Sequence, residues 1–313
     1  MNILITNIGR KIYFVEFLIN LKNKFRNLNI HLADNDDFSA AKNYGKTKNH
    51  TIPLVSAGSR KYLNAIKKII LKNRINLIIP LTNYDLKILS LNKEKLQKYN
   101  CEVLVSSHKL INKLLNKELL YYFCKEKKIN VPNTYFSIKD FGAKKNNLFI
   151  KKNKFGSASS GISIIKKIKK NHFYNNCIVQ DFIHGQELHF DILNDLRGNY
   201  LASCVKKKIH MRSGETDKAE VLYNKKFENL SKTISKAFGH VGNLDCDAII
   251  NKKGTVFFLD FNPRFGGGYP FTHMAGLNFL KLIICILLKK KFNLPVRPKL
   301  IKASKGLVLK VCK

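Results

Sequence analysis

The stretch 257–268, Phe-Phe-Leu-Asp-Phe-Asn-Pro-Arg-Phe-Gly-Gly-Gly, constrains the fold of this chain more than any other. Residues 256–261 are a β-branched and aromatic run, which predicts a buried strand. Asp260 interrupts the run, and Asn262 shares its face because side chains two positions apart in a strand point the same way. Carboxylate and amide oxygens on one face can bind a hard cation such as Mg²⁺. Pro263 then ends the strand, because it has no N–H to donate.

The residues after this strand suit an anionic ligand. Arg264 places a planar cation just beyond the proposed metal. Gly266, Gly267 and Gly268 allow backbone to approach a ligand closely, because they carry no Cβ. Taken alone, an acid at a strand end is usually a capping residue and a glycine triplet is usually a loop. The combination, and neither part by itself, indicates a functional site.

Two further acidic residues lie on a predicted strand that precedes this one. Residues 242–250 are predicted to form a strand with Asp245 and Asp247 on one face, and a turn at 251–254 returns the chain toward Asp260. Antiparallel strands joined in this way present the three carboxylates to one cleft. Such carboxylates repel one another unless a cation lies between them. The sequence therefore predicts a metal site on this hairpin.

A loop rich in glycine and serine lies near the middle of the chain. Residues 148–152 form a predicted strand that ends in Lys151 and Lys152, residues 155–162 read Phe-Gly-Ser-Ala-Ser-Ser-Gly-Ile, and residues 162–165 form the return strand. Small residues let backbone N–H groups point at phosphate oxygens, and a lysine neutralises the charge. No Gly-Lys-Ser/Thr opens a helix, so the loop is not a Walker A loop. It predicts a phosphate clamp, with a plain Ser/Gly hairpin as the alternative.

A further predicted strand, residues 177–183, is followed by His-Gly-Gln-Glu. The carboxylate of Glu187 can accept hydrogen bonds from two hydroxyl groups, although a surface hairpin acid is the simpler interpretation. Residues 188–193 alternate as a strand, and there we predict that His189 is a structural polar residue rather than a metal ligand.

The first hundred residues alternate between strands and helices. Apolar strands at 2–6, 30–33, 52–55, 77–80 and 103–106 are separated by helical patterns at 13–21, 62–71 and 85–96. This βαβ pattern predicts a small, mostly parallel sheet. It is not a dinucleotide fingerprint, because only Gly9 is present where three glycines are needed. Asp34, at the end of the second strand, is predicted to cap its turn.

Residues 260–264, Asp-Phe-Asn-Pro-Arg, resemble the Glu-x-Asn-Pro-Arg signature of ATP-grasp ligases, with Asp in place of the usual Glu. The continuation at 266–276, Gly-Gly-Gly-Tyr-Pro-Phe-Thr-His-Met-Ala-Gly, resembles the carbamoyl-phosphate-synthase-like branch of that superfamily. The resemblance implies an ATP-grasp fold, of α/β and α+β class, with a Rossmann-like pre-ATP-grasp domain at 1–108. The ATP-grasp domain would follow at 109–313, with a small lid-bearing subdomain at 109–180 and a C-terminal subdomain with the metal site at 181–313.

The resemblance also implies roles for individual residues. Lysines would hold the ATP phosphates, backbone groups after the strand at 177–183 would meet the adenine edge, and Glu187 would bind the ribose. Asp245 is an alternative to Asp247 as the first metal ligand, because the hairpin length varies in the family. The implied site residues are Lys117, Lys151, Gly156, Ser157, Ser159, Ser160, Gly161, Gln180, Asp181, Phe182, Ile183 and Glu187 for ATP, Asp247, Asp260 and Asn262 for the metal, Arg264 and Arg212 for catalysis, and Gly9, Arg10, Gly266 and Gly267 for the substrate.

The activity implied by the resemblance is ATP-dependent carboxylate–amine ligation. A small-molecule carboxylate would take the γ-phosphoryl group of ATP to give an acylphosphate and ADP, and an amine would displace phosphate, as in bacterial biosynthetic pathways. ATP and Mg²⁺ are the expected cofactors, with Mn²⁺ as an alternative ion. Two other classes stay open: a basic nucleic-acid-binding protein, and a catalytically inactive ATP-grasp module, for which the Asp in place of Glu at position 260 is the motive.

The net charge of +36 is unusual for a globular chain of 313 residues. The lysines are spread along the whole length without an Arg-rich block or a basic tail, so we interpret the charge as the background of an AT-rich genome and expect no specific nucleic-acid partner. The seven cysteines are scattered with no Cys-x-x-Cys, which indicates thiols in a reducing compartment. The most apolar helical run, 277–288, is too short to span a bilayer. We therefore expect a soluble cytoplasmic protein without a membrane partner, and a homodimer is one option.

Overall fold

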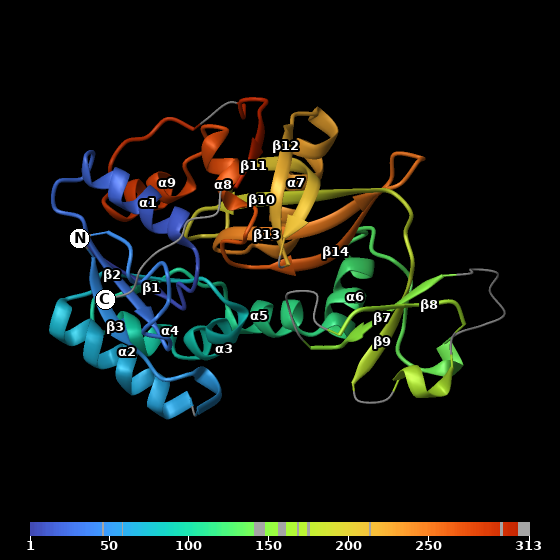
Figure 1. Ribbon diagram of the computed structural model, residues 1–313, viewed down its shortest axis with the longest axis horizontal. Helices are drawn as coiled ribbons and strands as arrows, with labels where there is room; N and C mark the ends of the chain where they lie inside the picture. Colours follow the sequence, from blue (N-terminus) through green and yellow to red (C-terminus); the bar gives the residue numbers. More distant parts are fainter. Residues whose placement is uncertain are drawn as a thin grey trace.

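The computed structural model describes residues 1–45, 47–57, 59–140, 148–155, 161–167, 169–173, 176–212, 214–294 and 297–305. These residues form three sheets of five, four and six strands. The N-terminal sheet lies at one end of the molecule and the small sheet at the other, and the large sheet lies between them (Figure 1). Within the described residues, no helix has both the length and the apolar character needed to cross a bilayer.

The N-terminal sheet has five parallel strands in the order β3-β2-β1-β4-β5, which confirms the predicted parallel sheet, although the third strand lies at Lys48–Thr51 and not at the predicted 52–55. Its elements are β1 (Asn2–Thr6), α1 (Ile12–Lys22), β2 (Asn29–Asp34), β3 (Lys48–Thr51), η1 (Val55–Ala57), α2 (Ser59–Asn73), β4 (Leu77–Pro80), α3 (Asn83–Leu91), α4 (Lys93–Gln97) and β5 (Glu102–Val103). The strand order reverses at β1, with β2 on one side and β4 on the other. Ligands of open α/β sheets bind at the carboxyl ends of the strands at such a point. The turns after β1 and β4 therefore lie where a ligand is expected.

Two helices lead from this sheet to the small one. They are α5 (His108–Leu115) and α6 (Lys117–Glu126), and the Asn116 side chain caps α6 by accepting hydrogen bonds from the backbone N–H groups of Glu118 and Leu119. This cap places Lys117 at the first position of α6. The small antiparallel sheet, in the order β6-β9-β7-β8, contains β6 (Thr134–Tyr135), η2 (Ile138–Asp140), β7 (Phe149–Asn153), β8 (Ser163–Ile165), η3 (Lys170–Phe173) and β9 (Cys177–Asp181).

The large antiparallel sheet has the order β14-β13-β10-β11-β12-β15. Its elements are β10 (Gln186–Asn194), β11 (Tyr200–Arg212), β12 (Glu215–Leu222), α7 (Lys225–Phe238), β13 (Gly242–Ile250), β14 (Val256–Asn262), α8 (Tyr269–Met274), α9 (Phe279–Leu287) and β15 (Lys302–Ser304). Helix α7 covers one face, where Phe227 packs on Phe190, and it ends at Gly239 in a left-handed C-cap. Residues 307–311, Leu-Val-Leu-Lys-Val, are an apolar run that predicts a closing strand, and they lie outside the described residues.

A bulge in β14 decides which face carries the acids. Asp247 pairs with Asp260 and Ala248 pairs with Phe258, so Leu259 is an extra residue without a partner on β13. Phe258 packs under α7, and the extra residue turns Asp260 to the opposite face. The carbonyl of Leu259, left out of the ladder, is available to another donor.

The N-terminal sheet and the C-terminal helices share one hydrophobic core. Helix α1 lies beside α8 and α9 (Figure 1), where the ring of Phe14 contacts Phe265 at 5.2 Å between centroids and Phe17 stacks on His273 at 3.6 Å. Burial of aromatic side chains on this scale holds the two parts together. The loop after β14 is thereby fixed against the N-terminal sheet.

Candidate active site

A cavity of about 800 Å³ lies where the three sheets meet. A pocket of this size is typical of a small-molecule or cofactor site. Most of the site residues predicted from the sequence line it: Lys117, Gln180, Asp181, Phe182, Ile183, Glu187, Asp247, Asp260, Asn262, Arg264 and Gly267. Of the predicted phosphate loop, Gly156, Ser157, Ser159 and Ser160 lie outside the described residues.

The β13–β14 hairpin presents the acids as predicted. The register places Asp247 opposite Asp260 and Asp245 opposite Asn262, so four oxygen-bearing side chains share one face. Asp247 and Asp260 each have a lysine partner. Lys208 Nζ lies 2.6 Å from Asp247 Oδ1, and Lys117 Nζ, at the start of α6, lies 3.3 Å from Asp260 Oδ1. The cavity wall therefore carries paired acids and cations.

These side chains fit a hard divalent ion. Burial would raise the pKa of Asp247, but the cations of Lys208 and His189 outweigh burial and hold that pKa below its usual value. Asp247 is therefore an anion at neutral pH. Two facing aspartates with an amide oxygen beside them are the donor set that Mg²⁺ prefers.

Asp245 and Asp247 differ in their access to the cavity. The Asp245 side chain is 8% exposed, and its oxygens lie 3.0 Å from Arg264 Nη1 and 2.8 Å from His189 Nε2. The Asp247 side chain is 37% exposed. The geometry therefore favours Asp247 as the residue that an ion entering from the cavity would meet.

The lysines at the end of β7 point in opposite directions. Lys152 shares a strand face with Ile150, and both line the cavity, whereas Lys151 lies on the other face and does not. Lys152 is 7% exposed, and its Nζ donates to Leu259 O, the carbonyl freed by the bulge, at 3.3 Å. The phosphate role assigned to Lys151 thus disagrees with the geometry, since strand alternation puts Lys152 in the cavity.

Burial lowers the pKa of Lys152 to about 7. The neighbouring Lys117 adds to this effect, and Asp260 and Asp247 oppose it. About half of the protein molecules therefore carry a neutral Lys152 at pH 7, and a bound anion would draw a proton onto this side chain.

The end of the cavity formed by the small sheet has apolar walls and exposed backbone. Ile150 and Ile162 line it, together with the chain segment that follows β9. The carboxylate of Asp181 is occupied by Tyr135 Oη at 2.9 Å and Asn133 Nδ2 at 2.8 Å. Glu187, with a side chain that is 53% exposed, keeps its carboxylate at the cavity edge. This end can accept a flat heterocycle through backbone groups.

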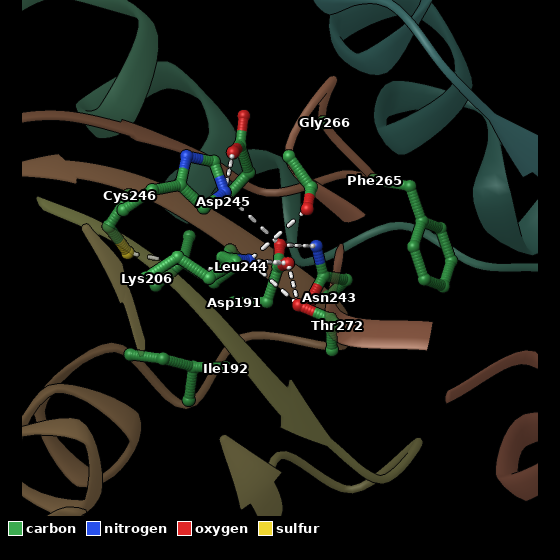
Figure 2. Close-up of polar contacts among 12 residues, drawn as sticks. Asp191, Ile192, Lys206, Asn243, Leu244, Asp245, Cys246, Phe265, Gly266 and Thr272 are labelled. Carbon is green, nitrogen blue, oxygen red and sulfur yellow. Dashed lines mark hydrogen bonds and ion pairs between the residues drawn. The ribbon is translucent and has the colours of Figure 1, made fainter. Parts of the chain in front are cut away.

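A buried polar network lies beside the acids on the same face of the large sheet (Figure 2). The Asp191 carboxylate, fully buried, accepts hydrogen bonds from Lys206 Nζ, from Thr272 Oγ1 and from Asn243 Nδ2. Lys206 Nζ also donates to Thr272 Oγ1 at 2.7 Å and to the carbonyl of Gly268 at 3.3 Å. A buried ion pair with this many hydrogen bonds holds β10, β11, β13 and α8 in one arrangement.

His189 completes this network. Burial and Lys206 lower its pKa, but the carboxylates of Asp245 and Asp191 outweigh them and raise it to about 10, so the ring is protonated at neutral pH. His189, Asp191 and Asp245 offer ligand atoms within 4.8 Å of one another. However, Lys206 and Arg264 already neutralise the two acids. This cluster is therefore an ion-pair network, in line with the structural role predicted for His189.

The glycine triplet is required by packing against these side chains. A Cβ at Gly266 would lie 2.3 Å from the Asp245 carboxylate, and a Cβ at Gly268 would lie 2.7 Å from the His189 ring. Gly267 lines the cavity, but Gly266 does not. The prediction that Gly266 faces the substrate is therefore not supported, since its missing side chain makes room for Asp245.

Three further predicted positions, Arg212, Gly9 and Arg10, lie outside the cavity lining. Arg212, near the end of the long strand β11, has a side chain that is 48% exposed and lies 3.5 Å from Asp217. Gly9, in the turn after β1, donates its backbone N–H to Asp34 Oδ2 at 2.6 Å. Asp34 Oδ1 accepts from the backbone N–H of Asp36 at 3.1 Å, so Asp34 caps the turn after its own strand, as predicted. Neither Gly9 nor Arg10 is part of the cavity lining, and Lys11 is.

Sequence reasoning missed several cavity residues: Lys11, Asn83, Lys152, Lys208 and Glu215. Alternation along β7 and β11 was the available signal for Lys152 and Lys208. No local pattern marks Lys11 or Asn83, because their place depends on how the N-terminal sheet docks against the large one.

Comparison with known proteins agrees with this geometry. Residues 114–268 match a family model described as an ATP-grasp domain, and residues 3–104 match one described as a PylC-like N-terminal domain. The two matches together cover most of the chain, so the protein has an ATP-grasp domain preceded by a PylC-like N-terminal domain. The predicted ATP-grasp domain and its fold are confirmed. No curated protein matches the sequence.

Solved structures share the whole fold at low sequence identity. Biotin carboxylase from Campylobacter jejuni, in a β,γ-ATP complex, has a TM-score of 0.72 at 16% identity over 96% of this chain and 73% of its own. The biotin carboxylase domain of Hydrogenobacter thermophilus 2-oxoglutarate carboxylase, with MgADP and bicarbonate, gives 0.70 at 16% over 95% and 71%. L-Amino acid ligase from Bacillus licheniformis gives 0.69 at 16% over 95% and 77%.

Proposed function

We propose that this protein is a Mg²⁺-dependent carboxylate–amine ligase. A substrate carboxylate attacks the γ-phosphoryl group of ATP, and an acylphosphate and ADP are formed. An amine then attacks the acyl carbon, phosphate leaves, and an amide-type bond results. The observation that carries the proposal is the facing pair Asp247 and Asp260, with Asn262 beside it, in a cavity that also holds several lysines.

Charge neutralisation around the transferring phosphoryl group is the main requirement of such a reaction. Lys152 and Lys117 are placed to bind the phosphates, since both line the cavity. Asp247, Asp260 and Asn262 would hold Mg²⁺, which when bound offsets the charge on the phosphate oxygens.

Arg264 is positioned to stabilise the transferred group. Its Nε and Nη1 are held by Asn83, Asp245 and the carbonyl of Phe265. Among the described residues these contacts leave Nη2 available to an anion in the cavity. A guanidinium fixed in this way supplies a donor without reorganising during the reaction.

The solved relatives support this assignment of cofactors. One was crystallised in a β,γ-ATP complex and another with MgADP. The relative described as an L-amino acid ligase makes amino acids the first carboxylates and amines to test.

The test is ADP release across a panel of carboxylate and amine pairs, with the amide product identified by mass spectrometry. Asp260→Asn should reduce ADP release at least about 100-fold, because one metal-binding charge is lost. The exposed acid Asp140, outside the cavity, supplies the control Asp140→Asn, which should retain activity. Full activity of Asp260→Asn, or ADP release that no pair stimulates, would contradict the proposal.

A further inference from the structure

Asn83, the first residue of α3, joins the N-terminal sheet to the acid face of the large sheet. Its Nδ2 donates to Asn262 Oδ1 at 2.7 Å, and its Oδ1 accepts from Arg264 Nε at 3.0 Å. Asn83 lines the cavity together with both partners. One side chain from the N-terminal part of the chain therefore touches both a proposed metal ligand and the proposed catalytic arginine.

Donor and acceptor rules determine how these amides are oriented. A guanidinium can only donate, so the atom of Asn83 that faces Arg264 must be the oxygen. The amide nitrogen of Asn83 then faces Asn262, and the atom of Asn262 that receives it must be Oδ1. A carbonyl oxygen has two lone pairs, so Asn262 Oδ1 keeps one for a cation. Arg264 thus sets the orientation of the Asn262 oxygen through Asn83.

The position of Asn83 is itself held by a buried carboxylate. Asp85, fully buried in the N-terminal unit, accepts hydrogen bonds from Thr82 Oγ1 at 3.0 Å, from Asn7 Nδ2 at 2.8 Å and from Thr6 Oγ1. These contacts tie the start of α3 to the end of β1. Asn83 is consequently presented from a fixed support at the point where the strand order of the sheet reverses.

We propose that Asn83 is a positioning residue for metal binding: it turns the Asn262 carbonyl oxygen toward the ion and steadies Arg264 beside it. The proposal rests on the proposed function, because it assumes that Asn262 is a ligand of the divalent ion. Through Asn83 the N-terminal domain then contributes directly to the geometry of the metal site.

The first test measures binding without turnover. Mn²⁺ is titrated into protein with a non-hydrolysable ATP analogue, and free Mn²⁺ is followed by electron paramagnetic resonance. Asn83→Ala should weaken Mn²⁺ binding about tenfold, since it removes one neutral and one charged hydrogen bond around the site. The control Asn92→Ala removes a contact at the other end of α3, the hydrogen bond from Asn92 Nδ2 to Ile88 O at 2.9 Å, and should change binding less than about twofold.

Asn83→Asp separates orientation from charge, and it answers the question if the alanine variant does not fold. The new carboxylate can accept from Arg264 but cannot donate to Asn262, so the Asn262 amide should rotate its NH₂ group toward it and its oxygen away. Mn²⁺ binding should therefore weaken, whereas simple attraction to an added negative charge would tighten it. Tighter or unchanged binding in both folded variants would overturn the proposal.

A double-mutant cycle tests whether Asn83 acts through Asn262. In an Asn262→Ala background, Asn83→Ala should weaken Mn²⁺ binding no further than about twofold. A full additional tenfold loss would refute the coupling. If the wild-type protein binds Mn²⁺ and nucleotide but no substrate pair releases ADP, only the proposed ligase function fails. No binding by the wild-type protein would refute both.

Discussion

The two lysines at the end of β7 provide the sharpest test of the site, because they are neighbours in sequence and lie on opposite strand faces. Lys152→Met should weaken nucleotide binding by one to two orders of magnitude, and Lys151→Met should leave it unchanged. Lys152 is buried and lines the cavity, and its partner Leu259 O is a neutral carbonyl. Methionine has a similar length and no charge, so the change removes little except the ammonium group.

The expected size of the effect follows from that ammonium group. A charge-assisted hydrogen bond contributes about 1.5–3 kcal/mol. Its loss should raise the Kd for ATP about 10- to 150-fold. The Lys152 variant should not lose stability, because a buried lysine without an acid partner in hydrogen-bond contact is itself unfavourable. Isothermal titration calorimetry gives the Kd, and thermal unfolding checks the fold.

The pH dependence of nucleotide affinity gives an independent test of the role of Lys152. The free Lys152 has a pKa of about 7, and bound phosphate would raise it, so the protonated form binds. Affinity should be complete below pH 7 and fall as the pH rises above it, with the Kd about tenfold higher at pH 8 than at pH 6 when Mg²⁺ is saturating. Lys152→Met should remove this dependence. Equal losses in both lysine variants, or a wild-type affinity that rises with pH, would refute the reasoning.

Two other changes test the surroundings of the site. Gly266→Ala should lower the free energy of unfolding by about 1–3 kcal/mol, because its Cβ would meet the Asp245 carboxylate at 2.3 Å. Gly267→Ala should lower it less, because its Cβ meets a more movable side chain. Chemical denaturation measures both changes. Arg212→Ala should change the KM values and kcat for the ligase reaction less than about twofold, because this side chain lies outside the cavity. A large loss of activity in steady-state assays would show that Arg212 does belong to the site.

Local patterns predicted those features of the site that depend on one or two neighbouring strands. Alternation and a short turn predicted that Asp247 and Asp260 face one cleft. The register pairs these residues, but only because the bulge at Leu259 shifts the register of β14 by one residue. The choice of Lys151 disagrees with the lining of the cavity, because it followed a family pattern instead of the alternation of β7. The bulge at Leu259 could not be predicted, since one extra residue in a strand leaves no clear trace in the sequence.

Features of the site that depend on tertiary docking left no recognisable pattern in the sequence. Asn83 and Asn262 are 179 residues apart, and they meet because α1 packs on α8 and α9. Arg212 was expected to take part in catalysis because the family resemblance implied it. The strand runs for 13 residues, so its end passes the cavity and Lys208 occupies the expected place.

The charges of the site explain why metal and nucleotide should depend on each other. Without ligands, Asp247 and Asp260 are balanced by Lys208 and Lys117. A metal ion alone would be repelled by these lysines, and a nucleotide alone would be repelled by the acids. When both enter, the acids can turn to the ion and the lysines to the phosphates, so each new attraction replaces an existing one. The low pKa of Lys152 belongs to the same balance, because that side chain gains its full charge only when an anion is present to offset it.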